Sequence, residues 1–104
     1  MPDPTVEQML AEARAQFAAS LPAKAAALQD HLARGAWEEA KRAAHKLRGS
    51  AGTYGFVVLG AAAGEVEEAL IAVGLQPDAA AAARIGDKAR EARAEAERIA
   101  GECA

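Results

Sequence analysis

The sequence predicts an all-α protein, an up-and-down antiparallel helical bundle with four long helices and one shorter helix. Hydrophobic residues make up 52% of the 104 residues, but aromatic residues only 4%. The core must therefore consist mainly of Ala, Leu, Val and Ile, which suits closely packed helices better than a β-sandwich. Apolar residues recur at helical spacing in five segments, and the short connections between them make successive helices antiparallel neighbours. A chain of this length has one core, so residues 1–104 are expected to form a single domain.

The first two helices are expected at roughly residues 5–19 and 20–35. Thr5 is a candidate N-cap of the first, although the pair Asp3-Pro4 could set its start instead. Its apolar stripe would contain Met9, Leu10, Ala13 and Phe17. The run Ser20-Leu21-Pro22 is typical of a cap followed by a proline in a first helical turn, so a separate second helix is predicted to begin there and stop at Gly35. Its stripe would contain Ala26, Leu28, His31 and Leu32.

Three more helices are predicted after Gly35. The third starts near Trp37, where two glutamates favour the helix dipole, and runs to about Thr53. Its inward residues would be Ala40, Ala44, Leu47 and Ala51. The fourth covers about residues 56–73, and its stripe would contain Leu59, Ala63, Val66 and Leu70. Asp78 is expected to cap the last, highly charged helix, which ends around residue 101. Its thin apolar seam would contain Ile85, Ala89, Ala92, Ala96 and Ile99.

Composition and motifs exclude several classes of function. The net charge of -3 gives the chain no excess of positive charge with which to bind nucleic acid. The N-terminus has no apolar signal region, and no stretch is long enough to span a membrane, so a cytoplasmic protein without a membrane partner is expected. His31 and His45 lie on different predicted helices and, with the lone Cys103, do not form a metal-ligand set; the cysteine also excludes an internal disulfide. No Gly-rich phosphate loop is present, so we expect no bound cofactor.

The residues around His45 form the candidate functional site. On a helix, His45, Arg48, Gly49 and Gly52 follow the i, i+3, i+4, i+7 spacing and share one face. Glycine costs a helix interior about 1 kcal/mol, but a strip without side chains lets the backbone of a partner approach the imidazole. Lys46 and Arg48 are near enough to help neutralise an added anionic group. A carboxylate of the fourth helix (Glu65, Glu67 or Glu68) could fix the ring tautomer, and periodicity alone does not choose among the three.

The run "AHKLRGSAGTYG" resembles the signature of histidine phosphotransfer (HPt) domains, in which a cation and then glycines follow the phosphorylated histidine. The longer run "RAAHKLRGSAGTYGFVVL", followed by "EVEEAL", is especially similar to the N-terminal phosphotransfer domain of chemotaxis histidine kinases. The resemblance is continuous from Trp37 to Leu70, about a third of the chain.

The resemblance implies roles for individual residues. His45 would take the phosphoryl group on Nε2, and Glu67 would hydrogen-bond the other ring nitrogen. Arg48 stands where the family usually has lysine, which keeps the charge but replaces a compact ammonium with a planar fork. Gly49 would let a receiver domain approach. Ala36 replaces an acidic residue that is common in the turn before the third helix.

The implied function is that of a phosphocarrier in a two-component phosphorelay rather than of an enzyme. Its partners would be a histidine kinase and response-regulator receiver domains, and the Mg²⁺ of the reaction would belong to the receiver. Two alternatives remain open: a detached phosphotransfer domain of a chemotaxis-type kinase, or a helical interaction module such as a kinase inhibitor, in which His45 is incidental. We expect a monomer, although the seam of the last helix could instead mediate dimerisation.

Overall fold

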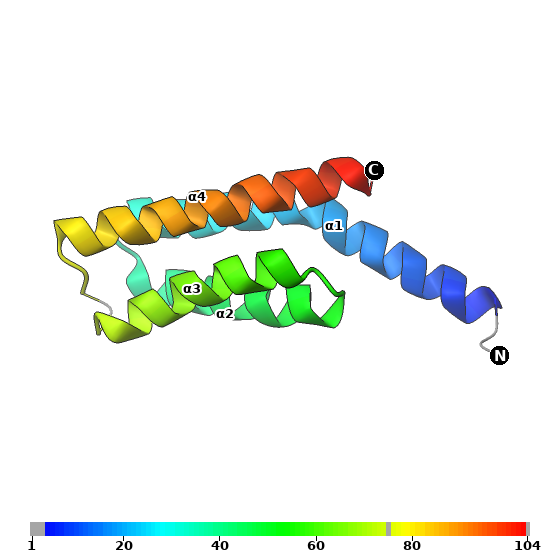
Figure 1. The fold of residues 1–104 in the computed structure, drawn as a ribbon, viewed down its shortest axis with the longest axis horizontal. Coiled ribbons are helices and arrows are strands. Elements are labelled where there is room, and N and C mark those ends of the chain that lie inside the picture. Colours follow the sequence, from blue (N-terminus) through cyan, green and yellow to red (C-terminus); the bar gives the residue numbers. More distant parts are fainter. Residues whose placement is uncertain (1–3, 75, 104) are drawn as a thin grey trace.

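The computed structural model describes residues 4–74 and 76–103, which form four helices. These are α1 (Pro4–Ala33), α2 (Trp37–Thr53), α3 (Val57–Ala72) and α4 (Ala79–Glu102). Helices α1 and α4 form one side of an up-and-down bundle, and α2 and α3 form the other (Figure 1). Each helix packs against two others, because α1 and α3 both contact α2 and α4. The expected all-helical bundle is confirmed, but the residues that the structure describes form four helices rather than five.

The difference in helix number comes from Pro22, which lies inside α1 and does not start a new helix. Ser20 does not cap a helix here; its hydroxyl donates to the carbonyl of Phe17 within α1, at 2.6 Å. Leu21 and Leu28, on either side of the proline, are fully buried. Burying each leucine contributes about 1.5–3 kcal/mol, and an interior proline costs about 3 kcal/mol. Tertiary packing therefore outweighs the local signal for a break.

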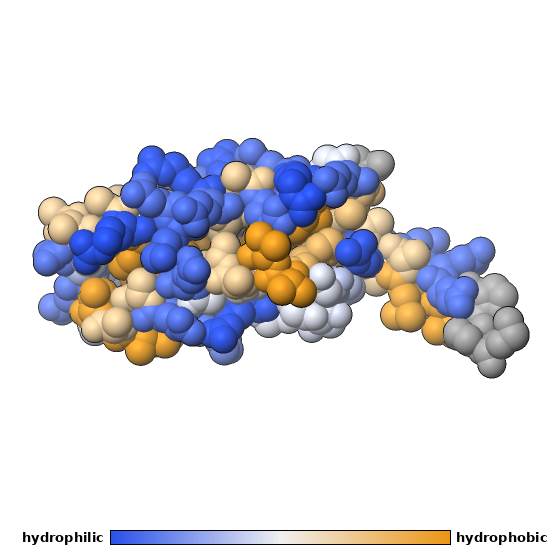
Figure 2. All heavy atoms as spheres, viewed as in Figure 1, coloured by the Kyte–Doolittle hydropathy of each residue, from blue (hydrophilic) through white to orange (hydrophobic). Residues whose placement is uncertain are grey.

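The stripe expected for the first helix was wrong at two positions, because Met9 and Leu10 are 62% and 65% exposed. Arg14 donates from Nε to the carbonyl of Tyr54, and Phe17 stacks on the Tyr54 ring, so the connection after α2 packs at this level of α1. The turns of α1 before Arg14 project past the end of the bundle (Figure 1) and carry apolar surface (Figure 2). The helix begins at Pro4, so Thr5 lies in its first turn, and Asp3 lies outside the described residues.

The stripe expected for the second helix is buried only at Leu28, since Ala26, His31 and Leu32 are half-buried, whereas the stripes expected for the three helices after Gly35 are confirmed. The four inward residues of α2, the four of α3 and the seam of α4 are all buried. The seam of α4 packs against the core of its own chain, and Asp78 caps the helix by accepting a hydrogen bond from the Ala81 backbone N–H at 2.8 Å. Because α2 and α3 are joined by only three residues, they run antiparallel in close contact and bring distant residues level with each other.

The connections after α1 and α2 are tight turns in which glycine has a structural role. Gly35 and Gly55 have φ values of +70° and +80°, a left-handed conformation that residues with a Cβ rarely adopt. Within the described part of the chain, no helix has the length and apolar character needed to cross a membrane.

Candidate functional site

His45 projects from the middle of α2 toward solvent, and its side chain is 74% exposed. The neighbouring residues on α2 determine this direction, because Ala44 and Leu47 are buried in the core. With these two residues held inward, the helical repeat directs position 45 away from the core. The imidazole is thus fixed to a rigid element while one of its edges stays accessible.

Glu67 of α3 holds the inner edge of the imidazole. Its Oε2 lies 2.6 Å from His45 Nδ1, and its side chain is only 10% exposed. An ionised carboxylate can only accept hydrogen bonds, so this contact favours the tautomer of the neutral ring that has its proton on Nδ1 and its lone pair on Nε2. The structure thereby selects Glu67 among the three candidate carboxylates. Glu65 instead pairs with Lys88 of α4 at 3.2 Å, and the Glu68 side chain is largely exposed.

Arg48 binds the second oxygen of the same carboxylate. Its guanidinium Nη1 lies 3.2 Å from Glu67 Oε1 and 3.7 Å from Glu68 Oε1. Glu67 therefore accepts from two residues of α2, with Oε2 bound to the histidine and Oε1 to the arginine. The positive charge of Arg48 compensates a carboxylate that would otherwise be costly to bury. Arg48 thus acts on the imidazole through Glu67.

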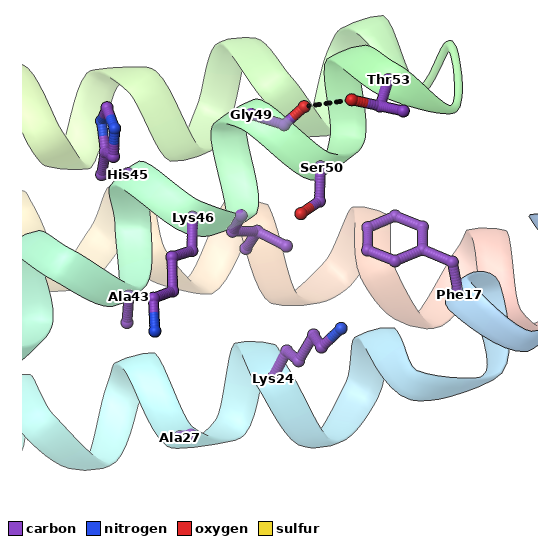
Figure 3. A pocket seen from close by; sticks show the side chains of 10 residues that line it. Phe17, Lys24, Ala27, Ala43, His45, Lys46, Gly49, Ser50 and Thr53 are labelled. Atoms are coloured by element: carbon purple, nitrogen blue, oxygen red, sulfur yellow. Dashed lines mark hydrogen bonds between the residues drawn. The ribbon is translucent and has the colours of Figure 1, made fainter.

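The glycines that follow His45 leave the surface of α2 open. A Cβ at Gly49 or Gly52 would meet no atom within 4 Å beyond its own helix and chain neighbours. Gly49 also borders a groove of about 600 Å³ between α1 and α2, shown in Figure 3. Its lining is completed by Phe17, Lys24, Ala27, Ala43, His45, Lys46, Leu47, Ser50 and Thr53. A partner can therefore reach the helix backbone within about one turn of His45.

Lys46 follows His45 on α2 and lines both the groove between α1 and α2 and the hollow that His45 and Glu67 line. In Figure 3 its side chain points toward α1, whereas the His45 ring points away from α1. Lys24 of α1 also lines the groove, with its Nζ 4.8 Å from the centre of the Phe17 ring. The two lysines place positive charge in the groove beside His45.

A family model described as the Hpt domain matches residues 12–102, which includes α2, α3 and α4 in full and most of α1. The chain belongs to the Hpt domain family. Hpt domains are phosphocarrier modules that transfer phosphoryl groups by way of a histidine in two-component phosphorelays, where they interact with histidine kinases and response regulators. Neither the comparison with curated proteins nor the one with solved structures gives a significant match.

Three features of this Hpt domain were not found from the sequence. Lys24 could not be found, because it reaches the groove from another helix. Lys41 and Arg42 line a second hollow beside His45 and Glu67, and their i−4 and i−3 spacing from the histidine was a usable signal. Gly64 of α3 lies under Arg48, which no periodicity within a single helix can reveal. Within residues 4–74 and 76–103, no three His, Cys, Asp or Glu side chains cluster in a way that could hold a metal ion.

Proposed function

We propose that this Hpt domain is a phosphocarrier that accepts a phosphoryl group on His45 Nε2 from a histidine kinase or a receiver-domain aspartate, and passes it to a response regulator. The observation that carries this proposal is the pairing of an exposed imidazole with a buried carboxylate on its Nδ1. That pairing leaves Nε2 as the nucleophilic atom and directs it toward solvent, where a partner can reach it.

In the transfer step, the imidazole of His45 is the one group of this chain that forms or breaks a covalent bond. The Nε2 lone pair attacks the phosphorus atom, and the bond from phosphorus to the donor oxygen breaks. The donor leaves as an aspartate carboxylate of a receiver, or as ADP when the donor is the ATP of a kinase. The ring, now bonded to phosphorus through Nε2 and still protonated on Nδ1, carries a positive charge. The return step onto a receiver aspartate is the reverse of the first.

Glu67 contributes to this step by stabilising the charge that develops on the ring. Its carboxylate accepts from Nδ1–H at 2.6 Å and becomes a closer partner as the imidazole becomes cationic. Arg48 keeps this carboxylate in place, and its charge, with that of Lys46, favours the approach of an anionic phosphoryl group.

Gly49 and Gly52 form the surface across which we propose that the receiver domain approaches. Both lie on the exposed side of α2, and no side chain fills the space above them. A docked partner can therefore bring its aspartate close to Nε2, which an in-line transfer requires.

We further propose that residues 1–104 act as one Hpt domain of the chemotaxis-kinase type. The contact between Glu67 and His45 supports this proposal, because it is the contact that the resemblance to chemotaxis kinases implied. The main alternative keeps the same chemistry: the chain would be a detached phosphotransfer domain of a chemotaxis-type kinase, phosphorylated by a separate catalytic domain. The second alternative is an interaction module that binds partners and is not phosphorylated.

A transfer assay with a matched pair of histidine variants tests the proposal. The wild-type protein, His45→Gln and His31→Gln are each mixed with labelled phospho-receivers and with active kinase domains. We expect the wild type and His31→Gln to take up label that is lost in acid and kept in base, and His45→Gln to take up none. If no donor labels any of the three while all three still bind a kinase, the interaction module is the correct function. Labelling by a kinase domain but by no receiver would favour the kinase-domain alternative.

A further inference from the structure

Gly64 lies on the face of α3 that packs against α2, and it is buried. A Cβ placed there would lie 3.2 Å from Nε, 3.3 Å from Cδ and 3.4 Å from Cζ of Arg48. These separations are shorter than ordinary van der Waals contacts of a Cβ. The arginine side chain therefore runs directly over the bare backbone of this residue.

The path over Gly64 leads Arg48 to Glu67. Gly64 precedes Glu67 by three residues, so the two share a face of α3 about one turn apart. The guanidinium of Arg48 crosses Gly64 and binds Oε1 of Glu67 at 3.2 Å. A Cβ at position 64 would force the arginine side chain to shift by a few tenths of an ångström from the path by which it reaches the carboxylate.

We propose that Gly64 is a positioning residue for phosphotransfer. Because it has no side chain, it admits the guanidinium of Arg48, which holds Glu67 in the orientation that accepts from His45 Nδ1. This inference rests on the function proposed above. The bare backbone at this position gives the long planar guanidinium of Arg48 room to reach the carboxylate.

The charge and burial of the three groups show why this support matters. The Glu67 side chain is 10% exposed and Arg48 is 49% exposed, so a nearly buried anion depends on a half-exposed cation. A buried carboxylate without a compensating cation is costly. Once Arg48 is displaced, Glu67 gains by turning toward water, and the hydrogen bond that keeps the proton on Nδ1 weakens.

A glycine at a helix interface can also serve packing alone, and Gly60 separates the two roles. It lies one turn before Gly64 on the same side of α3. A Cβ at Gly60 would lie 3.7 Å from Ala51 Cβ and 3.7 Å from the carbonyl oxygen of Arg48, which are ordinary contacts. Gly60→Ala and Gly64→Ala gain the same helix propensity, but only the second meets the arginine side chain.

The test compares Gly64→Ala, Gly60→Ala and Arg48→Ala with the wild type by two readouts. The ring ¹⁵N shifts of His45 report which nitrogen holds the proton, and single-turnover phosphorylation reports the rate. For Gly64→Ala we expect a smaller share of the Nδ1–H tautomer and a phosphorylation rate about two- to fivefold lower. A loss of this size is expected when a partly exposed ion pair is broken. Arg48→Ala should show the same change of tautomer and an equal or larger loss of rate, because it also removes the charge that favours the approach of the phosphoryl group, and Gly60→Ala should match the wild type.

The double variant Gly64→Ala/Arg48→Ala decides whether the glycine acts through the arginine. If it does, the double variant resembles Arg48→Ala alone, because residues in one network are not additive. An unchanged tautomer in Gly64→Ala, or rate losses that multiply in the double variant, would overturn the inference. If the wild type takes up no phosphate at all, the proposed function fails, and the tautomer comparison still decides the role of Gly64.

Discussion

Replacing Glu67 with glutamine tests the central contact of the site. Glu67→Gln keeps the size of the side chain and an oxygen that can accept from His45 Nδ1, but it removes the negative charge. A hydrogen bond to a charged group contributes about 1.5–3 kcal/mol and a neutral one about 0.5–1.5 kcal/mol, so the substitution removes about 1–1.5 kcal/mol. Water competes for a ring whose side chain is 74% exposed, so the lower end of that range applies. About 1 kcal/mol corresponds to a phosphorylation rate roughly fivefold lower.

The assay for Glu67→Gln is single-turnover phosphorylation by one donor, with Glu65→Gln as the matched control. Glu65 is on the same helix, but its carboxylate pairs with Lys88 of α4 and lies away from the imidazole. We expect a roughly fivefold loss for Glu67→Gln and the wild-type rate for the control. If the two variants have equal rates, the carboxylate does not stabilise the charged ring, and the role assigned to Glu67 is wrong.

Three further changes have defined outcomes. Gly49→Leu should slow phosphoryl transfer from a receiver at least tenfold, because it adds bulk to the open face of α2. Its melting temperature should be unchanged or higher, since leucine favours a helix more than glycine does. The control is Gly101→Leu, which adds the same side chain to another open helix surface. Pro22→Ala should raise the free energy of unfolding in urea by about 1–3 kcal/mol, and a decrease would show that the bundle needs the proline. The hydrogen bond from Arg98 holds the pKa of Glu95 below its usual value, so at pH 7 the wild type should be slightly more stable than Glu95→Gln. The stability difference between the wild type and Glu95→Gln should vanish as the pH falls through the lowered pKa of Glu95. A stability difference that grows in acid would contradict the stabilising role of the Glu95–Arg98 contact.

The helices after Gly35 could be predicted closely because each carries a consistent local pattern. The stripe of α2 around Leu47 and the seam of α4 around Ala92 repeat every three to four residues, and Asp78 supplies a cap. These signals need no knowledge of the rest of the fold. The predicted inward faces therefore match the buried residues of the structure.

The region around Pro22 could not be predicted in this way, because two local signals pointed to a helix boundary. Ser20 and Pro22 together are typical of a helix start, and only the burial of Leu21 and Leu28 against the other helices reverses that preference. The apolar residue Leu10 was likewise expected inside, since a periodic stripe does not show where the neighbouring helices end. Both errors come from treating a helix without its packing partners.

For the site, the sequence by itself determined the exposed histidine, the cation three residues later and the open glycine strip. These features depend on the repeat of one helix, which is the same in any fold. Helical periodicity left Glu65, Glu67 and Glu68 open and only the resemblance implied Glu67, whereas the tertiary structure places Glu67 at Nδ1, brings Lys24 and Lys46 to one groove, and lays Arg48 over Gly64. Each of these pairs joins two helices, so it depends on their relative rotation and register. Rotation and register are set by the packing of the whole core, which no single segment encodes.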